Sequence, residues 1–182
     1  SSGLLYRYAS FLIIKYKPKN ELALLNRKFK NLNYKKVEKL DLHNPKISEH
    51  SAIIAKKNKI RKVLKKYQID FSKKYKACCI EGRDISTKIL PGSDIKFFFK
   101  CSLDIAATRR YKELKKRNSK IKFKDVKKAL RIRNILDTKR RYSPLLKHRN
   151  SVEIDTGKLS KSAMLTKMSL YVDKVLKQKY EN

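Results

Sequence analysis

The segment of residues 81–91 contains an Arg-Asp pair, which follows a short apolar run and a glycine. The run, residues 77–80, has the composition of a buried strand, and Gly82 with the charges behind it is typical of a turn. In open α/β sheets, ligands bind just beyond the carboxyl ends of the strands. There Arg83 could grip a phosphate through two N–H donors, and Asp84 could hold that arginine, a metal-bound water or a sugar hydroxyl. This segment indicates a nucleotide enzyme.

A second group of polar side chains lies on a helix that we expect over residues 124–140. Arg133, Asp137 and Arg140 are spaced i, i+4 and i+7, so they would share one helix face. Such a face could be exposed and held by salt bridges, which is common in basic chains. It could instead grip a sugar or a base, with Arg140 reaching a phosphate. The spacing alone leaves both interpretations open.

A third group is the pair Arg109 and Arg110, on a helix that Ser102 is expected to cap. Further basic residues follow it: Lys112, Lys115, Lys116 and Arg117. A dense basic helix and loop can close over a polyphosphate and neutralise the charge that develops during transfer. A solvated lysine face explains the same pattern equally well.

A fourth feature is the Ser2-Gly3 turn at the start of a predicted helix. A turn that leads into a helix leaves backbone N–H groups available for an anion. Arg7 lies one turn inside that helix and could add its charge. Alone, this signal has little weight.

The elements that must position these groups alternate between helices and short apolar strands. Pro18 and Asn20 are expected to end one helix and to cap the next. Helices are predicted over 4–16, from Asn20 through Phe29, over 45–66, from Ser102 through Leu114, over 124–140 and over 159–177, and strands over 75–80, 95–101 and 152–155. This order predicts an α/β fold with a parallel sheet covered by helices on both faces.

Composition sets further bounds. The 182 residues suit one domain with a real core. No run of about 18 apolar residues indicates a membrane span, and the N-terminus does not have the pattern of a secretion signal. Cys78, Cys79 and Cys101 lack the spacing of a zinc site, so we expect small core residues in a reducing compartment. We expect the three histidines to be surface residues, and no hydrolase motif occurs.

The formal net charge of +33 favours a nucleic-acid partner when it is taken alone. The lysines, however, run from Lys15 to Lys179 rather than gathering in one tail. We therefore interpret most of them as solvated surface. The excess charge still attracts polyanions in general, including nucleotide phosphates.

Taken in order, these pieces resemble bacterial cytidylate (CMP/dCMP) kinase over nearly the whole chain. The start, Ser-Ser-Gly-Leu-Leu-Tyr-Arg, is similar to the family's Asp-Ser/Thr-Gly-x-x-Tyr-Arg, and residues 81–91 are similar to its Asp-Gly-Arg-Asp-x-Gly-Thr-x-x-x-Pro. Residues 42–47 with Ile60-Arg61 resemble its Ile-Arg-Thr-x-Glu-Val and the Val-Arg that ends the next helix. Residues 108–114, 133–145 and 154–160 follow its lid, Arg-Asp-x-x-Asp-x-x-Arg and Ile-Asp-Thr segments.

The resemblance implies a P-loop nucleoside monophosphate kinase fold that transfers the γ-phosphoryl group of ATP to CMP or dCMP. It implies Mg²⁺ as the ion that bridges the terminal phosphates, with catalysis by positioning and charge neutralisation. The implied acceptor-binding residues are Ser2, Arg7, Arg61, Arg83 and Asp84 for the phosphate and ribose, Arg133 and Asp137 for the sugar, and Arg140 for the phosphate. Arg83, Asp84 and Arg140 are the implied catalytic residues, Arg109 and Arg110 belong to the lid over ATP, and no residue is assigned to a metal.

By the same resemblance, residues 1–182 form one cytidylate kinase-like domain. Residues 18–75 would be the acceptor-nucleotide-binding region, residues 108–140 the lid region, and the remainder the core. The chain has no Gly-x-x-x-x-Gly-Lys loop. We therefore expect it to lack the family's first strand and P-loop, and to be inactive as it stands. His43 replaces an arginine and Ala52 a frequent serine, so the preference among CMP, dCMP and UMP stays open.

We expect a cytoplasmic monomer without membrane or specific nucleic-acid partners, although its charge permits non-specific binding. Two alternatives remain. One is a basic RNA-binding protein that reuses the fold, and the other is an inactive remnant that binds CMP without phosphorylating it.

Overall fold

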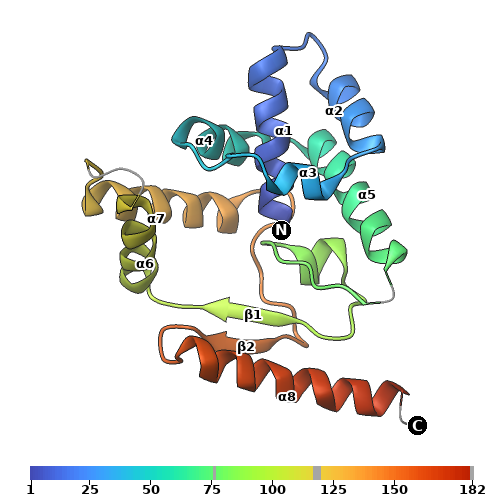
Figure 1. Cartoon of the computed structure of the whole chain (residues 1–182), viewed down its shortest axis with the longest axis vertical. Coiled ribbons are helices and arrows are strands. Elements are labelled where there is room, and N and C mark those ends of the chain that lie inside the picture. Colours follow the sequence, from blue (N-terminus) through green and yellow to red (C-terminus); the bar gives the residue numbers. More distant parts are fainter. Residues whose placement is uncertain (76, 117–119, 181–182) are drawn as a thin grey trace. The chain divides into compact units, whose positions relative to one another are not determined.

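The chain divides into two units in the computed structural model, which describes residues 1–75, 77–116 and 120–180 (Figure 1). The first unit comprises Ser1–Leu90 and Lys139–Leu145, and the second comprises Pro91–Thr138 and Leu146–Asn182. In the described part of the first unit all secondary structure is helical, whereas the second unit contains the sheet.

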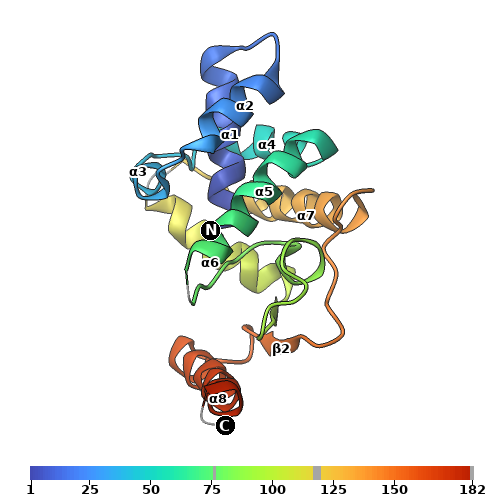
Figure 2. The same cartoon turned by 90° about the vertical axis from the view of Figure 1, so that its right-hand side faces the viewer.

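The first unit is a helix bundle around α1. Its elements are α1 (Ser2–Tyr16), α2 (Glu21–Lys30), α3 (Tyr34–Glu38), α4 (Pro45–Ile54), α5 (Asn58–Lys74) and a π-helical turn η1 (Ile85–Ile89). Helix α1 lies beside α2, α4 and α5 in both Figure 1 and Figure 2, and it packs against all three. The shared core consists of Leu5, Ala9, Leu12, Ile13, Leu24, Leu25, Phe29, Ile54, Ile60 and Leu64.

The predicted first two helices are confirmed, together with the residues that separate them. Helix α1 ends where Lys17 adopts a left-handed conformation with φ of 41°, and Pro18 follows. The Asn20 side chain then accepts a hydrogen bond from the Ala23 N–H at 3.0 Å, which caps α2. The turn therefore folds α2 back along α1.

The single helical pattern predicted over 45–66 is wrong in one respect, because two helices share it. Helix α4 ends at Ile54, Lys57 is extended, and α5 begins at Asn58. The periodicity survives the break because Ile54 and Ile60 both reach the same core. Apolar spacing reports which residues face the core, and here two helices share one core.

The second unit contains β1 (Phe97–Lys100), α6 (Leu103–Lys115), α7 (Phe123–Lys139), β2 (Val152–Asp155) and α8 (Lys161–Tyr180). The strands pair in parallel, from Phe97 opposite Val152 to Lys100 opposite Asp155. Helix α8 runs along this sheet in Figure 1, and the Tyr171 ring meets the Phe97 ring edge-on at 6.4 Å. The predicted α/β class and parallel pairing are confirmed, as are the strand at 152–155 and the cap of α6 by Ser102.

The strand predicted over 75–80 is wrong. Tyr75 and residues 77–80 form no strand, and Lys76 lies outside the described residues. Cys78, Cys79 and Cys101 are exposed, so the expectation that they are core residues is wrong as well. A strand needs a neighbour that pairs with its N–H and C=O groups, and four apolar residues in a row cannot provide one.

A spanning helix needs about 20 mostly apolar residues. None of the helices in the described ranges is long and apolar enough to cross a membrane.

Neighbouring isoleucines on α4 test the core of the first unit. Ile54 is 0% exposed and Ile53 is 49% exposed. We expect Ile54→Ala to lower the free energy of unfolding by about 2–5 kcal/mol, because it removes buried methyl groups and leaves a cavity. The matched control Ile53→Ala should change it by about 0.5 kcal/mol or less. Denaturant unfolding followed by circular dichroism measures both, and equal losses would contradict this core.

Candidate functional site

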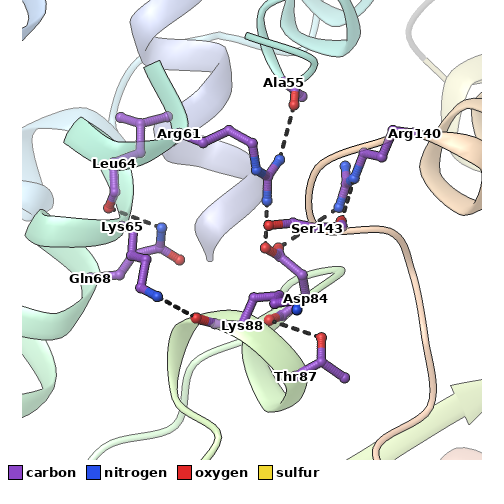
Figure 3. A network of polar contacts seen from close by, with 10 residues as sticks. All are labelled: Ala55, Arg61, Leu64, Lys65, Gln68, Asp84, Thr87, Lys88, Arg140 and Ser143. Carbon is purple, nitrogen blue, oxygen red and sulfur yellow. Dashed lines mark hydrogen bonds and ion pairs between the residues drawn. The ribbon is translucent and has the colours of Figure 1, made fainter. Parts of the chain in front are cut away.

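A buried carboxylate with two guanidinium groups forms the centre of the site (Figure 3). Asp84 precedes η1 and is only 5% exposed. Its Oδ2 atom pairs with Nη2 of Arg61 from α5, and its Oδ1 atom lies 3.8 Å from Nη2 of Arg140. Both arginine side chains are 6% exposed. The structure thus brings together three of the residues that the sequence predicted.

Arg61 is held from three sides. Besides the Asp84 contact, its Nη1 donates to the Ala55 carbonyl at 3.0 Å, and its guanidinium carbon lies 5.5 Å from the centre of the Tyr6 ring. Ala55 directly follows α4, in the break between α4 and α5 that the sequence did not predict. That break therefore supplies a backbone acceptor to the site.

Arg140 does not lie on a helix face, and this part of the prediction is wrong. Helix α7 ends at Lys139, so Arg140 begins the segment after it. Its Nε atom donates to the carbonyl of Ser143, a residue with a left-handed φ of 53°. The chain folds back on itself here, which turns Arg140 toward Asp84 (Figure 3).

The cluster brings two guanidinium groups to one carboxylate. Buried charges need partners, because losing water costs several kcal/mol per ion. Guanidinium groups carry positive charge and present N–H donors in fixed positions, so they can bind an anion such as a phosphate.

The segment at residues 81–91 is fixed against the start of α1. The Ser2 N–H donates to the Glu81 carbonyl at 3.0 Å, and the Ser1 hydroxyl contacts the Glu81 carboxylate. A Cβ atom at Gly82 would lie 2.3 Å from Ser2 Oγ and 2.8 Å from Ile85 Cγ1. Only glycine allows this close approach, so Gly82 is more than ordinary turn punctuation.

The other end of the segment is held by α5. Lys65 donates from Nζ to the Lys88 carbonyl at 2.6 Å, and the Thr87 hydroxyl donates to the Asp84 carbonyl at 3.4 Å (Figure 3). Arg83, half-buried, lies between these two anchored ends. The predicted pair Arg83-Asp84 is therefore held in a defined loop, in the same unit as Ser2, Arg7, Arg61 and Arg140.

Tyr6 is a residue of the site that sequence reasoning left without a role. Burial, partly offset by the charge of Arg61, raises the pKa of Tyr6 to about 12. Ser2 and Tyr6 are four residues apart on α1, so they share the helix face that meets Gly82 and Arg61. This spacing is the signal that could have identified Tyr6.

Arg7 makes a contact that the sequence also did not predict. Its Nη1 atom lies 2.6 Å from Nδ1 of His43, in the loop between α3 and α4. His43 is exposed, as expected, and Arg7 is half-buried.

The remaining predicted residues lie in the second unit. On α7, Arg133 Nε lies 3.8 Å from Asp137 Oδ2, so the predicted i, i+4 pair forms. Asp137 is 13% exposed at its side chain, which is low for a solvated helix face.

On α6, Arg109 donates to the Thr156 hydroxyl at 3.2 Å and to the Thr156 carbonyl at 2.6 Å, while Arg110 pairs with Glu113. Arg117 lies outside the described residues.

The residues present do not form a cradle for ATP and Mg²⁺. No segment of the 182 residues has the spacing Gly-x-x-x-x-Gly-Lys, whose backbone N–H groups and lysine hold nucleotide phosphates. Within the described ranges, no group of three histidine, cysteine, aspartate or glutamate residues lies close enough together to hold a metal ion.

Replacing Asp84 tests the cluster. Asp84→Asn keeps the shape of the side chain but removes the buried negative charge that both guanidinium groups contact, so we expect a loss of about 3–5 kcal/mol in the free energy of unfolding. Asp70→Asn is the control, since Asp70 pairs with Lys66 at 3.7 Å with both side chains largely exposed. The control should change stability by less than about 1 kcal/mol. Similar small losses in both variants would show that the cluster does not form.

Replacing Gly82 tests the contact between residues 81–91 and α1. Gly82→Ala should destabilise the protein by about 1–3 kcal/mol, because the new methyl group overlaps Ser2 and Ile85. Gly3→Ala is matched in chemistry, but its Cβ would meet only Ser1 Oγ at 3.6 Å within a helix. It should be neutral or stabilising by up to about 1 kcal/mol. Thermal or denaturant unfolding distinguishes the two variants. Unchanged stability of Gly82→Ala would contradict the close packing of Gly82 against Ser2 and Ile85.

Comparison with known proteins gives one consistent result. The sequence profile of the family described as Cytidylate kinase matches residues 1–174. A protein named Cytidylate kinase from Clostridium tetani is 31% identical over 140 residues, which cover 76% of this chain and 62% of that protein. Proteins of the same name from Bartonella tribocorum and Mesomycoplasma hyopneumoniae are 29% and 30% identical over 97% and 94% of this chain, and 82% and 80% of their own lengths.

The chain spans 62% and 61% of the lengths of the Clostridium tetani and Clostridium botulinum proteins. The matched residues 1–174 include the arginine cluster, the segment at residues 81–91 and the pair on α7. The chain therefore belongs to the cytidylate kinase family, whose fold is that of the P-loop nucleoside monophosphate kinases.

Proposed function

We propose that this chain binds CMP or dCMP as the phosphoryl acceptor of an ATP-dependent cytidylate kinase reaction. The observation that carries the proposal is the buried cluster of Arg61, Asp84 and Arg140, in which two guanidinium groups contact one carboxylate. Membership of the cytidylate kinase family and the names of the relatives support the same substrate class.

In this proposal, the arginines of the first unit contact the anionic part of the acceptor. Arg140 and Arg83 bind the phosphate, with Arg7 as a further donor, and Ser2 offers its hydroxyl beside Gly82. Guanidinium groups suit this task because their planar N–H donors match two phosphate oxygens at once. Positive charge at the acceptor also offsets the repulsion between two phosphate groups as they approach each other.

Asp84 has a different task. Both of its carboxylate oxygens face arginines, so it holds those arginines in position before any ligand arrives. A donor group of the acceptor nucleotide, such as a sugar hydroxyl, can share the remaining lone pairs of the carboxylate. Because the groups are fixed in advance, binding pays little for ordering them, and the acceptor is held in one orientation.

The second unit carries two further sets of residues, whose roles come from the family resemblance. That resemblance assigns Arg133 and Asp137 to the sugar, and this assignment stays a prediction. Arg109 and Arg110 belong to a lid over ATP. Arg109 would have to exchange its two hydrogen bonds with Thr156 for contacts with the donor nucleotide.

ATP and Mg²⁺ supply the transferred phosphoryl group and neutralise its charge when they are bound. The residues described above do not fit that role, so the donor site depends on a P-loop that these 182 residues do not contain. The acceptor half can be tested without it.

Calorimetric titration of the chain with CMP, near physiological salt, tests the proposal. We expect saturable binding with AMP and UMP weaker than CMP, and a melting temperature that rises with CMP because the ligand binds only the folded state. Arg83→Ala should weaken CMP binding about tenfold or more through the loss of charge-assisted hydrogen bonds. Lys88→Ala, which removes an exposed cation from the same segment, is the control and should bind normally.

Two outcomes would reject the proposal. Absence of CMP binding by a chain that unfolds cooperatively would favour a remnant without a working acceptor site. Affinity for single-stranded RNA that falls steeply with salt and ignores Arg83→Ala, with no preference among nucleotides, would favour a basic RNA-binding protein.

A further inference from the structure

Two cysteines, Cys78 and Cys79, are neighbours in the segment that leads into the candidate site. Both are exposed, and residues 78–80 belong to neither a helix nor a strand. Solvent therefore reaches both thiols, and no helix or sheet holds the backbone around them. An accessible cysteine with a second cysteine beside it is the arrangement that oxidants convert to a disulfide.

The backbone is fixed again two residues after Cys79. The Glu81 carbonyl accepts from the Ser2 N–H at 3.0 Å, and a Cβ atom at Gly82 would lie 2.3 Å from Ser2 Oγ. This close contact leaves Gly82 little room to move toward α1. A change in backbone direction at residues 78–79 therefore acts directly on the contact with Ser2.

We infer that Cys78 and Cys79 form a redox switch, a dithiol that hydrogen peroxide converts to a disulfide between the two neighbouring residues. One thiolate attacks the peroxide, so that an S–O bond forms, the O–O bond breaks and, after protonation, water leaves. The neighbouring thiol then attacks the sulfenic sulfur, so that the S–S bond forms and a second water leaves. Two thiols are oxidised, and one hydrogen peroxide is reduced to two waters.

The disulfide closes a ring over a single peptide bond, and this ring determines how oxidation acts. Consecutive Cα atoms lie about 3.8 Å apart, whereas Cα atoms joined by a disulfide usually lie about 4.4–6.8 Å apart. The ring is therefore strained, and a strained, exposed disulfide is easily reduced again. Ring closure also bends the backbone just before Glu81, which weakens the contact of Glu81 and Gly82 with Ser2.

Mass spectrometry after treatment of the folded chain with equimolar hydrogen peroxide tests the chemistry. Trypsin releases residues 77–83 as one peptide, which contains Cys78 and Cys79 but not Cys101. We expect this peptide to lose about 2 Da, the mass of two hydrogen atoms, and to regain it with dithiothreitol. The loss should persist in Cys101→Ser, because Cys101 is exposed but has no neighbouring cysteine, and should be absent from Cys78→Ser and Cys79→Ser.

Thermal unfolding of the oxidised chain tests the effect on the contact with Ser2. We expect the melting temperature to fall by about 2–4 °C on oxidation and to recover with dithiothreitol. Cys78→Ser and Cys79→Ser should not respond to peroxide, and they also report any effect of peroxide on the two methionines.

Three results would overturn the inference: a peptide of residues 77–83 that never loses 2 Da, disulfides that join two chains instead, or a melting temperature that oxidation leaves unchanged. None of these measurements uses CMP, so their outcome is independent of the proposed function.

Discussion

The carboxylate of Asp84 is the interaction on which the candidate site depends. Its two oxygens contact Arg61 and Arg140, and all three side chains are almost completely buried. Loss of this negative charge would take from two buried guanidinium groups the carboxylate that they share, which is strongly unfavourable. Such a pairing adds little net stability by itself. Its consequence is geometric, because segments from α5, η1 and the end of α7 must meet at one carboxylate.

Several local features follow from that meeting. Gly82 lets residues 81–91 approach Ser2, and Lys65 holds the Lys88 carbonyl at the other end of the segment. The break after α4 gives Arg61 a backbone acceptor, and the left-handed Ser143 gives Arg140 another. Neighbouring residues alone do not explain these features. Together they hold Asp84 and the two arginines in contact with one another.

The extreme charge of the chain and the charge of the site have different physical character. The 49 basic residues are spread over both units, and most of the lysines are solvated, so salt screens them. Buried arginines in fixed contacts are screened far less and act at short range. The surface excess can raise the local concentration of any phosphate compound. In the proposed function, selectivity for one nucleotide would come from the ordered groups around Asp84.

The sequence by itself determined the local elements and the chemical character of the site. The helix caps at Asn20 and Ser102 depend on residues three positions away, so a linear pattern reveals them, and the charged turn at Arg83-Asp84 is visible from its residue types. Tertiary structure decided what needs a distant partner. It left residues 77–80 without a strand and exposed Cys78 and Cys79, split one helical pattern at Ala55, and placed Tyr6 on Arg61 and His43 on Arg7. Those contacts depend on how separate segments pack, which local spacing does not encode.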